Sequence, residues 1–292
     1  MKNLVNLKEL DIYGRSHIVH AHLDSVPFSL THLFSSWMED SDSDTKIDSD
    51  SRKDPPLLAI LQAHPTLEEL GLSLPSALWM PRDLVSALKA EQEGVVEEND
   101  IICPKLRRFD GCDEGLRLFL PTRRIECVTA LGRGAEYIVE MDKHLSIWLN
   151  PILQQSYQHI RVLEVWPEED HYIWFFPTIA LYLTSLTHLC IFGDVRELAH
   201  RSCDLSSALG QIETLQSITL SSAGEEGITM VDVQEAVQFV QGALPDVKEI
   251  FVGLEEEEEM VYYRYVEGEG MRCKVVGQDV ACRLYTKWMR DS

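Results

Sequence analysis

The sequence has few basic residues for its length, and this shortage limits the partners that it can bind. Its 292 residues include 26 lysines and arginines against 48 aspartates and glutamates, which gives a formal net charge of −22. Such an excess of negative charge repels the phosphates of nucleic acids and the headgroups of anionic membranes. We therefore expect neither nucleic acid nor a membrane as a partner, and we favour a basic or apolar protein surface.

Long hydrophobic runs and paired cysteines are also lacking. The longest apolar run, Tyr172 to Leu183, contains Pro177 and is well short of the roughly 20 residues that a membrane-spanning helix needs. The seven cysteines include no C-x-x-C pair, no asparagine lies in an N-x-S/T sequon, and the amino terminus shows no signal segment. These absences predict an intracellular protein, cytoplasmic or nuclear, with reduced cysteines.

The sequence contains no motif that would support an enzymatic function by itself. It has no G-x-S-x-G elbow, no P-loop, no G-x-G-x-x-G after a strand and no H-E-x-x-H. The stretch HIVHAHLD is similar to the zinc motif of metallo-β-lactamase-type hydrolases, with closely spaced His17, His20, His22 and Asp24. Ser25 stands where that motif continues with a second-metal histidine. We predict no enzyme, no cofactor and no metal, with a metal-dependent hydrolase as the distant alternative.

A spacing of apolar residues recurs along the whole chain. In SLTHLCIFG, residues 185 to 193, Leu186, Leu189 and Ile191 form an L-x-x-L-x-L pattern. The same spacing returns in NLKELDIYG, TLEELGLSL, HIRVLEVWP and TLQSITLSS, and more weakly in SLTHLFSSW, KLRRFDG, RIECVTALG and DVKEIFVGL. A unit with one strand cannot bury its own apolar face, so such units are stable only when they stack. The spacing therefore predicts a leucine-rich-repeat solenoid.

Helical patterns alternate with these strands. They lie at residues 55–64, 81–92, 113–120, 137–157, 174–183, 206–212 and 231–243. Strand, crossover helix and strand in succession are typical of a parallel sheet. We therefore predict an α/β fold of one irregular repeat domain over residues 1–292, with a curved parallel sheet on one face and irregular helices on the other.

Two acidic segments interrupt this pattern. Residues 39–54, EDSDSDTKIDSDSRKD, have no apolar periodicity and are expected to be a disordered insertion. We favour a solvated spacer; the alternative is a phosphorylated segment, because Ser41, Thr45 and Ser51 each have an aspartate three residues later. The glutamate run 255–259 is expected to be a solvated loop. A β-hairpin around EGEG and a helix at 279–290 would complete a C-terminal cap over 255–292.

Alternation along the strands defines a candidate binding surface. With positions one, four and six of each repeat buried, positions three, five and seven point to the open face of the sheet. This register exposes Glu9, Asp11 and His32. Large apolar groups on such a face are typical partner anchors. The candidate partner-binding residues are Tyr13, Phe34, Glu164, Trp166, His188, Phe192 and Phe251, although Trp166 and Phe192 could instead pack against neighbouring loops.

The repeats HPTLEELGL and SLTHLCI, the block FSLTHLF and the tail KWMRD resemble the leucine-rich portion of fungal F-box proteins. The resemblance covers nearly the whole chain. In that family an N-terminal F-box docks the adaptor of a cullin-type ubiquitin ligase, and the repeats present a substrate. The resemblance therefore implies a protein–protein interaction module that serves as the substrate-recognition part of a ubiquitin ligase receptor.

No F-box helices precede Leu7, so ligase docking is implied only if an F-box lies upstream. The chain begins inside a repeat without the polar cap that a solenoid end needs, and we expect that a segment precedes it. The alternative function is a leucine-rich-repeat scaffold without an F-box and without a link to ubiquitin. In either case we expect a monomer that binds a protein through its sheet face.

The acidic insertion provides a first test of the repeat boundaries. Replacing residues 39–54 by a short Gly/Ser linker should change the free energy of unfolding by less than about 1 kcal/mol, because loop-closure entropy varies slowly with loop length. Thermal denaturation of the full chain and the variant would measure this. Loss of cooperative folding in the variant would show that the segment belongs to the repeat stack.

Overall fold

The structure is a computed structural model, and not every residue of the chain is described by it. The described residues are 7–13, 29–36, 57–73, 80–97, 100–111, 113–130, 157–165, 177, 180–192, 210–222, 228–256, 259–266, 268 and 270–277. The acidic insertion at 39–54, most of the helix expected at 137–157 and the terminal helix expected at 279–290 lie outside them. These three expectations stay predictions.

The chain divides into two compact units, and each is described by itself. Unit 1 comprises Met1–Ile125 with Gly134–Glu136, and unit 2 comprises Glu126–Arg133 with Tyr137–Ser292. The expectation of one repeat domain over residues 1–292 stays a prediction. Within each unit, neighbouring strands of the sheet follow one another in chain order.

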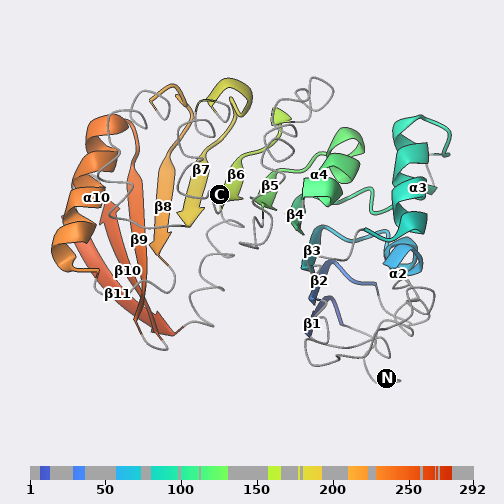
Figure 1. Ribbon diagram of the computed structural model, residues 1–292, viewed down its shortest axis with the longest axis horizontal. Coiled ribbons are helices and arrows are strands. Elements are labelled where there is room, and N and C mark those ends of the chain that lie inside the picture. The colour runs from blue at the N-terminus through green and yellow to red at the C-terminus, as the bar shows by residue number, and fades with distance from the viewer. Residues whose placement is uncertain are drawn as a thin grey trace, which may run out of the picture. The chain divides into compact units, whose positions relative to one another are not determined.

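Unit 1 contains a parallel sheet built from the predicted repeat strands. Its strands are β1 (Glu9–Tyr13), β2 (His32–Ser36), β3 (Glu69–Ser73) and β4 (Arg108–Gly111) (Figure 1). Equivalent positions of the repeats are in register, so that Leu10, Leu33, Leu70 and Phe109 form one row. The apolar spacing in the sequence therefore sets the strand register.

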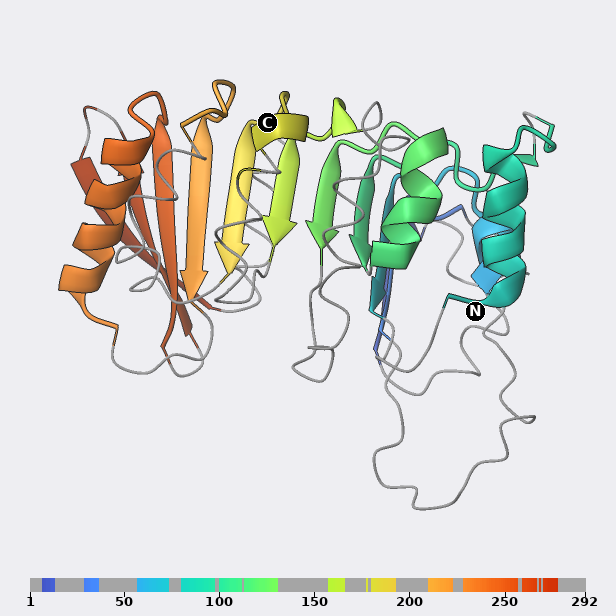
Figure 2. The same cartoon turned by 45° about the horizontal axis from the view of Figure 1, so that its top comes forward.

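Unit 2 continues the same pattern and ends in an antiparallel hairpin. Its parallel strands are β5 (Cys127–Ala130), β6 (Val162–Val165), β7 (His188–Phe192), β8 (Ser217–Ser222) and β9 (Glu249–Glu256). Figure 2 shows β5 to β8 running side by side in one direction. The antiparallel strands β10 (Glu259–Val266) and β11 (Gly270–Gly277) confirm the predicted hairpin.

The glutamate run at 255–259 was expected to be a loop, and this was wrong for most of it. Glu255 and Glu256 end β9, and Glu259 begins β10, where Glu259 pairs with Glu256. Backbone hydrogen bonds of an antiparallel pair are independent of side-chain charge, and glutamate is only mildly disfavoured in strands. The repulsion between the glutamates is therefore outweighed by strand pairing.

Helices precede the strands at four of the seven places that the sequence predicted; much of the segments expected at 174–183 and 206–212 lies outside the described residues. They are α2 (Leu57–Ala63), α3 (Arg82–Gln92), α4 (Asp113–Phe119) with the 3-10 helix η4 (Leu120–Thr122), and α10 (Met230–Ala243). Helix α3 begins directly after Pro81, and α10 begins with a capping box between Thr229 and Asp232. The protein is thus an α/β repeat solenoid with parallel strands and interleaved helices.

The repeat leucines form the core, and polar side chains connect one repeat to the next. Leu186, Leu189 and Ile191 are each at most 1% exposed. The Thr66 hydroxyl donates a hydrogen bond to the carbonyl of Leu30 at 2.9 Å, and an equivalent bond of 2.7 Å joins Thr214 to Leu186. These bonds recur at the same repeat position in both units. They fix the stacking of successive repeats, because a buried carbonyl without a partner would destabilise the fold.

The core register can be tested at Leu189. Leu189→Ala should lower the free energy of unfolding by about 2 to 5 kcal/mol, as large-to-small changes in a packed core do. Denaturant unfolding followed by circular dichroism measures the change. The matched control is Leu181→Ala, since Leu181 is 65% exposed and should change stability by less than about 0.5 kcal/mol. Similar losses for the two variants would contradict the assigned register.

Candidate functional site on the open face

The open face of the sheet consists of the strand side chains that alternate with the core. In unit 1 it has two rows that run across the strands in register. The first row carries position three of each repeat, and the second carries position five. We call these residues the unit 1 face: Glu9, His32, Glu69 and Arg108 in the first row, and Asp11, Phe34, Gly71 and Asp110 in the second.

The first row alternates acidic and basic side chains around His32. The imidazole Nε2 of His32 lies 3.0 Å from Glu69 Oε1, and its Nδ1 lies 3.9 Å from Glu9 Oε1. The hydroxyl of Thr31 lies 2.8 Å from the same Nδ1 and so holds the ring in place. The His32 side chain is 23% exposed and that of Glu9 is 65% exposed. This row is a polar surface whose side chains are partly exposed.

The second row is shaped by a glycine under an aromatic ring. A Cβ atom placed on Gly71 would lie 2.2 Å from Cδ2 of Phe34, closer than any real contact. Only glycine therefore lets the half-buried Phe34 ring lie across the neighbouring strand β3. Asp11 and Asp110 occupy the same row on either side. The ring thus lies on the face between two carboxylates.

In unit 2 the second row of the face is buried. This row consists of side chains that are each at most 7% exposed: Thr129, Glu164, Cys190, Thr219 and Phe251. The expectation that Glu164 and Phe251 are exposed was therefore wrong, because both sides of these strands are packed. The Oε2 atom of the buried Glu164 carboxylate accepts a hydrogen bond of 2.9 Å from the Thr129 hydroxyl, as buried polar groups commonly do.

His188 lies in the first row of unit 2 and is half-buried. The Thr187 hydroxyl lies 2.8 Å from its Nδ1, which repeats the geometry of Thr31 and His32 in the other SLTHL block. Burial lowers the pKa of His188, and the carboxylate of Glu249 opposes this effect by raising it. The ring is therefore held mainly as a neutral, oriented group at neutral pH.

The side chains of the remaining candidate residues lie outside the described part of the chain. Tyr13 and Phe192 belong to β1 and β7, but their side chains are outside the described part. Trp166 and the candidate phosphorylation sites Ser41, Thr45 and Ser51 also lie outside it. Arg108 and Asp110 were not among the predicted site residues. The repeat KLRRFDG carries them at positions three and five, so its register would have revealed both.

No family model matches the chain. No curated protein matches it in sequence either. Among solved structures, a Bacteroides fragilis protein determined by a structural genomics consortium aligns with 85% of this chain and 68% of its own chain, at 15% identity and a TM-score of 0.44. A likeness of that size carries no argument about function. The fold assignment rests on the strand order and register described above.

Two further properties of the described residues bear on function. None of the helices among them is long and apolar enough to span a membrane. Within the same residues, no three histidine, cysteine, aspartate or glutamate side chains come together as metal ligands. His17, His20, His22 and Asp24 lie outside these residues, so the zinc-like motif stays untested.

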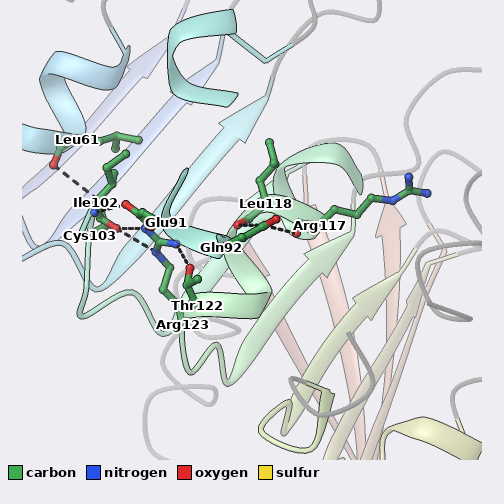
Figure 3. A network of polar contacts seen from close by, with 9 residues as sticks. All are labelled: Leu61, Glu91, Gln92, Ile102, Cys103, Arg117, Leu118, Thr122 and Arg123. Carbon is green, nitrogen blue, oxygen red and sulfur yellow. Dashed lines mark hydrogen bonds and ion pairs between the residues drawn. The ribbon is translucent and has the colours of Figure 1, made fainter. Parts of the chain in front are cut away.

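A buried polar network joins α3 to η4 in unit 1 (Figure 3). The guanidinium of Arg123 donates to Glu91 Oε2 at 2.6 Å and, through Nε, to the carbonyl of Ile102 at 2.9 Å. The other carboxylate oxygen of Glu91 accepts from the Ile102 amide at 2.6 Å. The guanidinium also lies 5.0 Å from the ring centre of Phe119. Both charged side chains are at most 2% exposed.

The same network surrounds Cys103, which is an unreactive thiol. Burial raises the pKa of Cys103 to about 12, and nearby Arg123 only partly opposes this. The thiol therefore stays protonated at neutral pH, and its Sγ lies 3.7 Å from the carbonyl of Leu61. Glu91 and Arg123 are 32 residues apart and the sequence alone did not connect them. We interpret the contacts of Glu91, Arg123 and Ile102 as a structural feature rather than a binding site, and we call these three residues the staple.

The staple makes a specific prediction for stability. Arg123→Met keeps much of the side-chain length but leaves the Glu91 carboxylate and the Ile102 carbonyl buried without this partner, so it should cost about 3 to 5 kcal/mol. Urea unfolding of the variant measures the loss. The exposed Arg107 in the same unit provides the matched control, and Arg107→Met should change stability by less than about 0.5 kcal/mol. Equal effects at the two positions would disprove the structural role.

Proposed function

We propose that the protein is a protein–protein interaction module whose partner binds the unit 1 face. The observation that carries this proposal is the difference in accessibility between the two units. In the second row of unit 1, Asp11 is exposed and Phe34 and Asp110 are half-buried, whereas the second-row side chains of unit 2 are each at most 7% exposed. The unit 1 face is thus the more accessible part of the predicted binding surface.

Regular strand spacing supports the use of this face for binding. Neighbouring parallel strands lie about 4.7–4.9 Å apart, so each row presents its side chains at a fixed interval. Repeat proteins use such extended surfaces to bind other proteins along their length. A carboxylate, an imidazole and an aromatic ring at fixed positions give the face both polar and apolar contacts.

At a finer level, we propose that the repeats recognise the substrate of an F-box-type ubiquitin ligase. Support comes from the resemblance of HPTLEELGL, SLTHLCI and FSLTHLF to the repeats of fungal F-box proteins. The role depends on an F-box that docks the ligase adaptor. Without one, the same face serves a scaffold with no link to ubiquitin.

The proposed face can be tested by reversing its charge. The double variant Glu9→Lys with Asp11→Lys changes two exposed residues of β1 and should leave the melting temperature nearly unchanged. We expect it to lower the affinity for a partner by tenfold or more, about 1.4 kcal/mol. A partner captured by the tagged full chain would be purified, and its binding to both forms measured by biolayer interferometry.

The matched control is Glu235→Lys with Asp246→Lys, two exposed acidic residues of unit 2. This variant has the same change in net charge and should bind the partner like the original chain. Equal binding by the two variants would refute the unit 1 face. Co-purification of a cullin and its adaptor with the longest natural form would support the ligase role, and their consistent absence would favour the scaffold.

A further inference from the structure

We propose that the unit 1 face takes an arginine-bearing, basic segment of a partner protein, with a guanidinium stacked on the ring of Phe34. This proposal rests on the proposed function, because it assigns a chemistry to the partner of the same face. It follows from the shape of the second row and from the charges around it. It concerns an extended segment, since the face consists of rows of side chains that run across neighbouring strands.

The first step is the position of the ring. The Cδ2 edge of the Phe34 ring lies against Gly71, and any side chain at Gly71 would collide with it, because a Cβ there would come within 2.2 Å of the ring. The ring is nevertheless only half-buried. One edge of it is thus directed at backbone that carries no side chain, and part of its surface is accessible. An aromatic face of this kind attracts cations through its quadrupole.

The second step is the charge around the ring. Asp11 and Asp110 lie on the two sides of Phe34 and Gly71 in the same row. Asp11 is exposed and forms no ion pair with any residue that the structure describes. In the first row, Glu9 and Glu69 add two carboxylates around His32. Against these four acidic side chains the face has one arginine, Arg108, so its net charge favours a cationic occupant.

The third step selects arginine among cations. A guanidinium is planar, stacks on an aromatic ring and can at the same time form paired hydrogen bonds with a carboxylate. An ammonium is compact and strongly hydrated, so it gains less binding free energy from contact with an aromatic ring. Nucleic acid and anionic lipid carry the same sign of charge as the face and are repelled by it. A basic protein segment is therefore the class of partner that this surface fits.

The test uses synthetic peptides and the full chain. The probe is a fluorescein-labelled Gly/Ser peptide with arginine at every second position over its centre, because an extended strand directs alternate side chains to one side. Its counterpart has citrulline, a neutral analogue of similar shape, in place of each arginine. Fluorescence anisotropy at low and at physiological salt should show binding of the arginine peptide, at least tenfold tighter than the citrulline peptide and weaker at higher salt.

Variants then locate the contact. Phe34→Leu keeps an apolar side chain but removes the aromatic face, and should weaken binding of the arginine peptide about two- to tenfold. Phe34→Tyr keeps the aromatic face and should preserve binding. Asp11→Asn removes one carboxylate at an exposed position and should weaken binding without lowering the melting temperature. The matched control is Glu235→Gln on α10, which should leave binding unchanged.

Three results would overturn the proposal. The first is equal binding of the arginine and citrulline peptides. The second is a loss with Glu235→Gln as large as that with Asp11→Asn, which would reveal only general attraction to an acidic protein. The third is unchanged binding in Phe34→Leu, or lost binding in a folded Phe34→Tyr. If a captured partner still depends on Glu9 and Asp11 while the arginine peptide does not bind, the proposed function stands and the arginine chemistry fails.

Discussion

The structure depends on one constraint: a repeat with a single strand cannot bury its apolar side chains alone. Each leucine row is covered only when the next repeat pairs with it in parallel and in register. The row from Leu33 through Leu70 to Phe109 shows this in unit 1, and the row from Leu163 through Leu189 to Ile218 shows it in unit 2. Parallel pairing in turn requires a crossover between strands, which is why helices such as α3 and α10 separate them.

The same alternation that buries the leucines creates the opposite face, and the two units use it differently. In unit 2 the second row is buried, and there the Thr129 hydroxyl donates a hydrogen bond to Oε2 of Glu164 and Phe251 is at most 4% exposed. In unit 1 the second row remains accessible at Asp11 and Phe34. A buried polar row contributes to stability, whereas an accessible row is available for recognition. The proposed binding function therefore falls on unit 1.

Recognition at this face would combine a rigid support with a few exposed groups. The Thr31 hydroxyl holds the imidazole of His32, and Gly71 leaves room for the ring of Phe34. Away from the face, the Glu91–Arg123 pair fastens α3 to η4 within the same unit. A surface held in this way loses little conformational freedom when a partner binds, which favours affinity.

The sequence by itself determined the repeat strands, their register and the helices at α2, α3, α4 and α10. It could do so because the apolar spacing of strands and helices is set by residues a few positions apart. It also placed Phe34 and His188 on the open face. The tertiary structure alone decided that Glu164 and Phe251 are buried, that the ring of Phe34 lies over Gly71, and that Arg123 meets Glu91. Each of these depends on contacts between residues far apart in the chain, and local pattern carries no information about what covers a side chain.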